Sequence, residues 1–412
     1  MKINKIIITV AILIGSVFCS AAQDAMSPYS RYGYGTLIDN ATSAQRAMGG
    51  VGYAMQSGRQ INVMNPASYA SIDSLTFLFD MGLTMTNHWA SDNGEKVKDF
   101  GGGLDYITLQ VPITKYLGAS AGLLPYSSTG YSFGNNIDNG ANSYQGSGGI
   151  NQLYAGVGVK PFKGFSLGVN FSYLFGKTRN DNYVYTDAGA TTLFERVMDV
   201  RDYNVQFGLQ YFLPLGKTRS ITVGAVYSPG KDFRGNTYGI KYDTTNDSEP
   251  DTIGQMNLKG NYSRPATWGA GINMQVNRRL MVEADFTYQQ WSKAKFNAID
   301  GFEGTQFDDR WKVAAGLQYV QNQRGSWFRR IQYRLGGYYT RDYIKFGDNN
   351  VKEYGVSLGF GLPAPASKTL INLGLQYSHR QATPNPLVKE DCLYITIGVN
   401  FNELWFWRNK IK

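Results

Sequence analysis

Hydrophobic and polar residues alternate with a period of two along much of this chain. In residues 203–213 the odd-numbered positions are apolar or aromatic, and the even-numbered positions are polar or small apart from Phe212. Side chains of a β-strand point alternately to opposite faces, so this segment predicts a strand with one apolar and one polar side. Similar segments of about ten residues recur from 75–88 to 391–401, and this repetition is typical of a transmembrane β-barrel.

The connections between these segments predict the number of strands. Long polar connections, such as 133–143 and 178–191, alternate with short ones, although 321–329 is long where a short turn is expected. Pro229-Gly230 interrupts the segment 219–242, and this dipeptide usually marks a turn. A kink within one long strand keeps the strand number even, as barrels require. We predict an all-β, antiparallel barrel of fourteen strands over residues 75–401, with a periplasmic tail at 402–412.

The first 22 residues have the features of an export signal. Lys2 and Lys5 precede an apolar run from Ile6 to Phe18, and small residues follow at 20–22, so the mature chain is expected to start at Gln23. Cys19 would allow a lipoprotein, but the bulky Phe18 before it fits a lipobox poorly. No later segment has the ~18 consecutive apolar residues of a membrane helix. An exported chain with these strands is expected in the bacterial outer membrane.

Composition limits the other function classes. After loss of the leader only Cys392 remains, which excludes an intramolecular disulfide and a thiolate metal cluster. The formal net charge of +9 is dispersed, so we expect anionic membrane lipids rather than nucleic acid as partners. In the predicted topology Trp89, Trp291 and Trp311 lie near the outer rim and Trp327, Trp405 and Trp407 near the periplasmic rim, with Trp268 unassigned. Two such belts favour a membrane barrel over a soluble β-sandwich.

The segment at 23–74 does not have a strand pattern. Residues 43–54 are mostly small, with one charge at Arg46, and Asn65-Pro66-Ala67 is a turn signal. A segment of about fifty residues without regular structure before the first strand is uncommon unless it has a function. Small residues favour tight packing, so we interpret 23–74 as a plug inside the barrel. A disordered periplasmic arm is the alternative.

The same residues carry a family resemblance. Arg46-Ala47-Met48-Gly49-Gly50, then Asn65-Pro66-Ala67, then the first strand resemble the long-chain fatty-acid transporter (FadL-type) family. Further similarities lie at Pro265, Trp268 and Gly271, in the segment from Leu280 to Tyr288 that is followed by Trp291-Ser292, in the strand from Arg310-Trp311 to Tyr319, and at 333–336. The Asn-Pro-Ala and Trp-Ser motifs are the more specific ones. The resemblance implies a fourteen-stranded outer-membrane barrel with an N-terminal hatch and passive uptake of hydrophobic small molecules such as long-chain fatty acids. It assigns hatch or gating roles to Arg46, Asn65, Pro66 and Ala67, and implies no cofactor.

One departure from the family keeps a second function open. The family often carries acidic residues between the glycine-rich stretch and Asn-Pro-Ala, whereas 55–64 holds no carboxylate here. Some relatives serve as accessory barrel subunits of outer-membrane secretion or protein-assembly complexes. In that reading the partners include other envelope proteins.

Charged residues expected in the lumen give a specific hypothesis. Arg46 is the only charge between Asp39 and Arg59, and an unpaired buried charge is costly. We expect Arg46 to bond to plug carbonyls or to the lumen-lining residues Asp80, Glu283 or Asp285, among which the sequence does not choose. The alternative is an Arg46 that reaches water in the periplasm.

Catalytic chemistry is not expected. The two histidines, His88 and His379, are predicted at outer strand ends with no nucleophile motif nearby, and with one cysteine they do not make a metal-ligand set. Gly101-Gly102-Gly103 precedes a strand rather than a helix, so it is not a phosphate loop. The sequence therefore predicts a protein that is not an enzyme and has no metal.

Overall fold

The computed structural model describes residues 27–92, 94–245, 251–257, 262–296, 306–365 and 368–404. The predicted signal peptide at 1–22 and most of the predicted tail at 402–412, with Trp405 and Trp407, lie outside these ranges. Helices within them are all short: η1 Pro28–Arg31, α2 Ser43–Arg46, η2 Pro66–Ser71, η3 Trp291–Lys293 and η4 Trp327–Arg330. No described helix is long and apolar enough to cross a bilayer.

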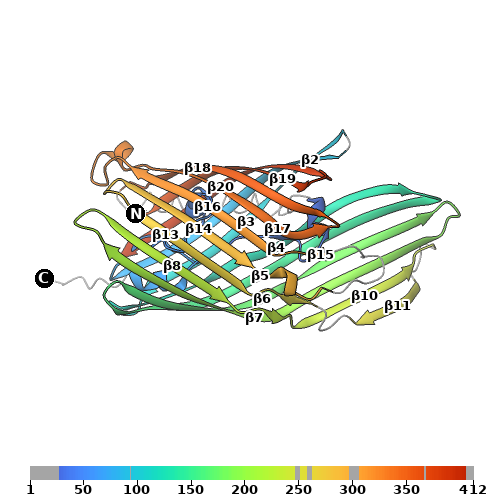
Figure 1. The fold of residues 1–412 in the computed structure, drawn as a ribbon, viewed down its shortest axis with the longest axis horizontal. Coiled ribbons are helices and arrows are strands. Elements are labelled where there is room, and N and C mark those ends of the chain that lie inside the picture. Colours follow the sequence, from blue (N-terminus) through green and yellow to red (C-terminus); the bar gives the residue numbers. More distant parts are fainter. Residues whose placement is uncertain are drawn as a thin grey trace.

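The predicted antiparallel barrel of fourteen strands is confirmed (Figure 1). The last strand pairs with the first, from Thr76 opposite Leu404 to Ser91 opposite Lys389, which closes the wall. Twelve wall positions hold a single strand each: β2 Thr76–Asp92, β3 Glu95–Pro112, β4 Leu117–Ile137, β5 Gly140–Phe162, β6 Phe165–Thr186, β7 Thr191–Pro214, β14 Leu280–Gln289, β16 Arg310–Val320, β17 Gln332–Phe346, β18 Asn349–Pro363, β19 Leu370–Thr383 and β20 Lys389–Leu404. The two positions between β7 and β14 hold two segments each. The first consists of β8 Ser220–Ser228 and β10 Gly235–Asp243, and the second of β11 Asp251–Asn257 and β13 Thr267–Gln275.

The period-two pattern produces two different faces of this wall. In β7, Phe207, Leu209 and Tyr211 are exposed on the outside, whereas Gln210 is fully buried against the interior. An apolar outer face matches lipid, and a polar inner face matches a lumen. The alternation in the sequence therefore specified the orientation of the strand.

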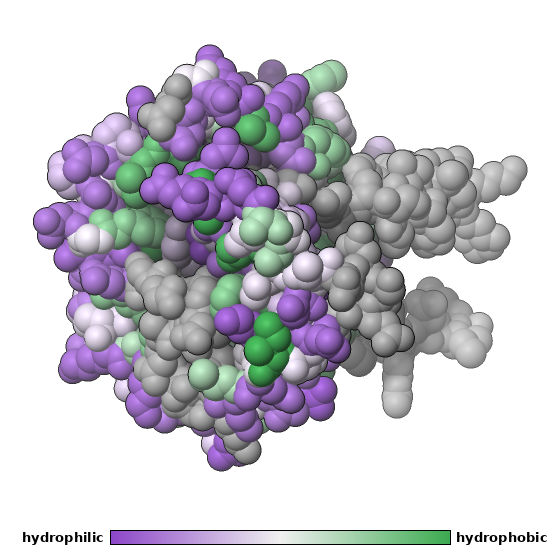
Figure 2. Space-filling view, turned by 90° about the vertical axis from the view of Figure 1, so that its right-hand side faces the viewer, coloured by the Kyte–Doolittle hydropathy of each residue, from purple (hydrophilic) through white to green (hydrophobic). Residues whose placement is uncertain are grey.

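One end of the barrel is much longer than a membrane requires. β4 to β7 have 21, 23, 22 and 24 residues, whereas about 9–11 residues cross a bilayer. With β10 and β11 they project beyond the other strands at one end, the extended end (Figure 1). Figure 2 views this end, and the residues coloured there are predominantly hydrophilic.

This extension corrects the loops predicted at 133–143 and 178–191. Both segments are largely strand: β4 and β5 pair as far as Ile137 opposite Gly140, and β5 and β6 as far as Gly140 opposite Thr186. Both faces of these strands are polar because they stand in water, so their composition looked like that of a loop. The opposite end has short connections and is called the short-turn end; in outer-membrane barrels it is periplasmic.

Pro229-Gly230 is a kink within one long wall strand, as expected. β8 ends at Ser228 and β10 starts at Gly235, and both pair with β7. Between them, β9 Lys231–Asp232 leaves β7 and pairs with β12 Ser263–Arg264. Proline lacks a backbone N–H, so an interruption of the ladder is the expected consequence.

The described tryptophans test only part of the predicted belts, because Trp405 and Trp407 lie outside the described residues. Trp268 lies between Tyr227 and Tyr288 on the outer surface, and Trp311 packs on Tyr339. Trp291, predicted for the outer rim, is instead fully buried. It belongs to an aromatic cluster that fills the interior at the extended end.

Candidate functional site

Residues 27–72 fill the barrel interior from the extended end to the short-turn end, and we call this segment the plug. At the extended end β1 Thr36–Leu37 adds to the edge of β4, with Thr36 opposite Ser128. In the middle, α2 contacts β18, β19 and β20, and at the short-turn end η2 contacts β5, β6 and β7. Contacts with opposite sides of the wall place the segment inside the lumen rather than in a periplasmic arm.

The carboxylates of β14 hold the middle of the plug. Asp285 Oδ2 accepts from the backbone N–H groups of Gly52 and Tyr53 at 2.7 and 3.0 Å. Glu283 Oε1 accepts from the N–H of Ala54 at 3.0 Å. The two predicted lumen residues therefore anchor the plug backbone rather than line an open path.

Asn65-Pro66-Ala67 lies where the plug contacts β7. The Asn65 side chain donates to the carbonyls of Tyr53 and Leu209 at 2.7 and 3.1 Å. Its Oδ1 accepts from the N–H of Ala67 at 3.1 Å, so Asn65 caps η2, with Pro66 in its first turn. All three residues are buried.

Glycines on the inner wall allow this close approach. A Cβ at Gly224 would lie 1.9 Å from the carbonyl oxygen of Tyr53, and one at Gly168 would lie 2.3 Å from the carbonyl carbon of Pro66. Both distances are far below van der Waals contact. The plug backbone is therefore fitted against the wall backbone, which only glycine permits.

Arg46 is bonded to the wall, as we expected, but through an acid that the sequence did not identify. Its Nη2 lies 2.8 Å from Asp105 Oδ1 in β3, and its Nε donates to the carbonyl of Ala41 at 3.2 Å. Asp80, a proposed partner, instead accepts from Tyr106 Oη at 2.8 Å. Tyr106 Oη in turn accepts from the N–H of Ser43 at 2.9 Å, so Asp80 supports the plug indirectly.

The wall is interrupted between β3 and β4. Described pairs between these strands run only from Ile107–Leu123 to Pro112–Gly118. Beyond them comes Pro125, which lacks a backbone N–H, and the β4–β5 register shifts between Pro125 and Ser127. The part of β3 from residue 95 to 106 therefore has no described pairing with β4, and we call this gap in the wall the lateral opening. β1 of the plug lies along its β4 edge.

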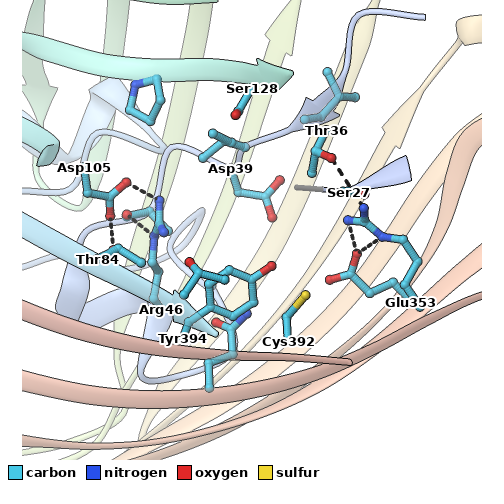
Figure 3. Close-up of a pocket in the computed structure, with 18 of the residues that line it drawn as sticks. Ser27, Thr36, Asp39, Arg46, Thr84, Asp105, Ser128, Glu353, Cys392 and Tyr394 are labelled. Carbon is cyan, nitrogen blue, oxygen red and sulfur yellow. Dashed lines mark hydrogen bonds and ion pairs between the residues drawn. The ribbon is translucent and has the colours of Figure 1, made fainter. Parts of the chain in front are cut away.

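A chamber of about 280 Å³ lies at this opening, bounded by residues 102–105 of β3 and by Pro125, Ser128 and Gly130 of β4. Figure 3 shows Arg46 and Asp105 at one side of it and Glu353 at another. The chamber is charged: Arg380 Nη2 lies 2.5 Å from Glu353, and Lys312 Nζ lies 2.6 Å from Asp39.

Asp39 shows how the charges of the chamber are balanced. Burial alone would raise its pKa, but the nearby cations Lys312 and Arg310 outweigh burial and hold the pKa of Asp39 below its usual range. The carboxylate is thus ionised at neutral pH and fixes the plug to two residues of β16. A second, smaller cavity of about 120 Å³ is lined largely by amides and hydroxyls, among them Asn40, Gln152, Asn170 and Gln206.

An aromatic cluster closes the interior at the extended end. Tyr34 of the plug packs against Trp291, Phe233 and Phe296, and Trp291 stacks on Tyr343 with ring centroids 4.4 Å apart. Tyr34, Trp291 and Tyr343 are fully buried. Tyr34 Oη also donates to the carbonyl of Ser263 at 2.8 Å. The lumen is therefore filled at both ends.

The two histidines flank β20, with His88 opposite Cys392 and His379 opposite Asp391, but their environments differ. His88 is buried beside Glu390, at 3.6 Å, and faces the chamber. His379 Nδ1 lies 2.8 Å from Asp391 Oδ1, and Tyr377 Oη donates to the same oxygen. Neither arrangement includes a serine or cysteine hydrogen-bonded to a histidine among the described residues.

Comparison with solved structures supports the fold. The Pseudomonas putida toluene transporter TodX superposes with a TM-score of 0.63 at 16% identity, covering 89% of this chain and 98% of that one. A Pseudomonas aeruginosa FadL homologue gives 0.61 at 13% identity, with 89% and 99% covered. The Ralstonia pickettii toluene transporter TbuX gives 0.57 at 15%, with 88% and 98% covered. The expected FadL-type barrel is confirmed at the level of fold, which leaves ligand specificity open.

Comparison of sequences identifies the family. No curated protein matches this chain. One family model, described as BamG, matches residues 2–412, nearly the whole chain. This chain, which has the fold of FadL-type barrels, therefore belongs to the BamG family.

Proposed function

We propose that this protein is a permanently plugged barrel of the bacterial outer membrane that serves as a subunit of a protein complex. The observation that carries the proposal is the plug itself, which fills the lumen from end to end and is bonded to the wall along its length. In this proposal residues 1–22 are the export signal, 23–74 form the plug, and the short turns face the periplasm.

The energy needed to displace the plug supports this reading. Three hydrogen bonds and two ion pairs hold it: two hydrogen bonds to Asp285, one to Glu283, the Arg46–Asp105 pair and the Asp39–Lys312 pair. At about 0.5–3 kcal/mol each they contribute several kcal/mol, and burial of plug side chains such as Met48, Ile61 and Tyr69 adds about 1.5–3 kcal/mol apiece. A micromolar ligand supplies only about 8 kcal/mol in total. Binding of a small molecule therefore does not displace the whole plug.

The chemistry of the chamber also supports the subunit function. Binding sites for small molecules are mostly apolar, with a few polar groups. Here four cations and five carboxylates line the space, namely Arg46, Arg310, Lys312, Arg380, Asp39, Asp105, Asp342, Glu353 and Glu390. An apolar ligand would desolvate these charges without replacing their hydrogen bonds.

A second candidate is passive uptake of a hydrophobic molecule, as in the transporters that share the fold. The lateral opening between β3 and β4 favours it, because a ligand could pass from the chamber into the bilayer there. Aromatic hydrocarbons and long-chain fatty acids are the ligand classes to consider. Gating would then involve local movement of the plug around Arg46 or Asn65-Pro66-Ala67 rather than its release.

Two measurements on the same strains separate these functions. The protein is purified from native membranes in mild detergent and its companions are quantified by mass spectrometry. Uptake of labelled toluene and of a labelled long-chain fatty acid is compared in cells with and without the gene. A stoichiometric protein partner with unchanged uptake supports the subunit. A solitary barrel with gene-dependent uptake overturns it in favour of the channel.

A further inference from the structure

The connection between β16 and β17 is unlike the other connections at the short-turn end. Most of these are turns of a few residues, whereas residues 321–331 form a folded loop that contains η4. Its backbone is closed by hydrogen bonds from Asn322 N–H to the Arg329 carbonyl and from Arg329 N–H to the Ser326 carbonyl, at 2.8 and 3.0 Å. η4 protrudes from this end of the barrel (Figure 1).

This loop presents a large aromatic side chain to solvent. Phe328 is 74% exposed, the highest value among the large hydrophobic side chains of the described residues. Its position is restrained by the neighbouring Trp327, which donates its Nε1–H to the Pro363 carbonyl at 2.7 Å. Trp327 and Phe328 also pack edge to face. An ordered, exposed aromatic pair of this kind is typical of a binding hot spot.

Arginines surround this aromatic pair. Arg324, Arg329 and Arg330 belong to the loop, and Arg278 and Arg279 lie in the neighbouring β13–β14 turn, which Gln323 contacts through the Arg278 carbonyl. Residues 276–280 and 321–331 contain no Asp or Glu. Within the part of the chain that the structure describes, none of the five arginines forms an ion pair. We call these residues with Trp327 and Phe328 the arginine patch.

The distribution of charge around the rim argues for protein rather than lipid as the occupant. Lipid surrounds a barrel on every side, and the other short turns carry cations suited to its phosphates: Lys115, Lys160, Lys163, Lys217 and Arg219. The arginine patch occupies one sector only. Protein interfaces are enriched in Arg, Trp and Phe. The arginine patch has this composition, although Lys368 lies in the adjoining β18–β19 turn, whose Pro363 carbonyl accepts from Trp327.

We propose that the arginine patch is the docking surface for an acidic segment of a periplasmic or lipid-anchored protein subunit. Carboxylates of the partner would pair with the guanidinium groups of these arginines, and an apolar pocket of the partner would bind Phe328. This inference rests on the proposed subunit function and names the surface and partner chemistry that the function requires.

The test uses the full chain expressed in its native membrane. The patch variant combines Arg324→Glu, Arg329→Glu and Arg330→Glu. Its matched control combines Lys115→Glu, Lys217→Glu and Arg219→Glu, which makes the same charge change in other sectors of the rim. Heat-modifiable migration on gels verifies that each variant folds as a barrel. In a third variant a photoreactive benzophenone amino acid replaces Phe328.

We expect the patch variant to lose at least tenfold of its co-purifying partner, and the control to lose less than twofold. Cross-linking from position 328 should reach a protein segment rich in Asp and Glu, and high salt should reduce it. Equal loss in both charge variants, or cross-links to phospholipid alone, overturns the proposal. If the patch variant keeps its partner, the surface is wrong and the subunit function stands. If the wild type has no stoichiometric partner, both fail.

Discussion

Arg46 in the plug and Asp105 in β3 form an ion pair of 2.8 Å beside the point where β3 and β4 stop pairing. Asp105 is the extra residue of β3 at a register shift opposite Gly82 and Leu83 of β2. A bulge of this kind re-aims a side chain, here into the lumen. The pair therefore ties the plug to the edge of the lateral opening.

Removal of Arg46 should destabilise the protein strongly. Arg46→Ala leaves the buried Asp105 carboxylate without its cation, and breaking such a pair costs about 3–5 kcal/mol. The free energy of unfolding in urea, followed by tryptophan fluorescence, measures the effect. Arg59→Ala is the control, because the Arg59–Asp73 pair is exposed and 3.5 Å long, so its loss should cost less than about 1 kcal/mol. Equal costs would contradict the assigned role of Arg46.

Asp285→Ala should loosen the middle of the plug. It removes the acceptor of two plug N–H groups, and orphaned buried donors cost about 1–3 kcal/mol each. Brief openings should then appear as conductance steps in planar bilayers, where the wild type stays closed. Asp187→Ala, in an exposed turn, should behave as the wild type does. An Asp285→Ala variant without conductance steps would show that this carboxylate does not hold the plug.

Gly224→Ala should prevent correct seating of the plug. The added methyl would lie 1.9 Å from the Tyr53 carbonyl oxygen, so the plug or the wall must move. Overpacking of this kind costs about 1–3 kcal/mol. Thermal unfolding in detergent measures the loss. Gly103→Ala provides the control, since nothing lies within 4 Å of the new methyl; similar losses in both variants would argue against close fitting at Gly224.

Tyr34→Ala should open the aromatic cluster at the extended end. Deleting a fully buried aromatic side chain costs about 3–5 kcal/mol. Cys392, which is buried beside the chamber, reports access to the interior. A charged, water-soluble thiol reagent should modify Cys392 at least tenfold faster in the variant. Tyr185→Ala, at an exposed site, should leave the rate unchanged. An unchanged rate in Tyr34→Ala would mean that the cluster does not seal the lumen.

The sequence predicted the wall better than the interior. Alternation in segments such as 203–213 depends on local strand geometry, and so the strand number and the Pro229-Gly230 kink were predictable. The strands of the extended end were not, because polar residues such as Lys177 to Thr186 stand in water and lose the apolar face that marks a membrane strand.

For the interior, the sequence identified the kinds of residue but not their pairing. The small residues of 43–54 predicted close packing, and Asp80, Glu283 and Asp285 all support the plug. The Arg46–Asp105 pair depends on a bulge in β3, which has no signal in a single sequence. The isolated Gly101-Gly102-Gly103 stretch and Pro125 were the features that could have indicated an irregular wall there.

A reversible covalent lock tests the central claim, that the plug stays in place while the protein functions. A Cβ at Gly374 would lie 3.7 Å from the Cβ of Ala47, a spacing suited to a disulfide. The same Cβ would lie 2.4 Å from Thr396 Oγ1, so the lock variant and its parent both carry Thr396→Ala. The variant Ala47→Cys/Gly374→Cys is made in a Cys392→Ser background and used to complement a deletion strain under oxidising and reducing conditions. Our account predicts equal complementation and equal partner recovery in both. Function that is lost on oxidation and restored by reduction would show that the plug must move, and would contradict it.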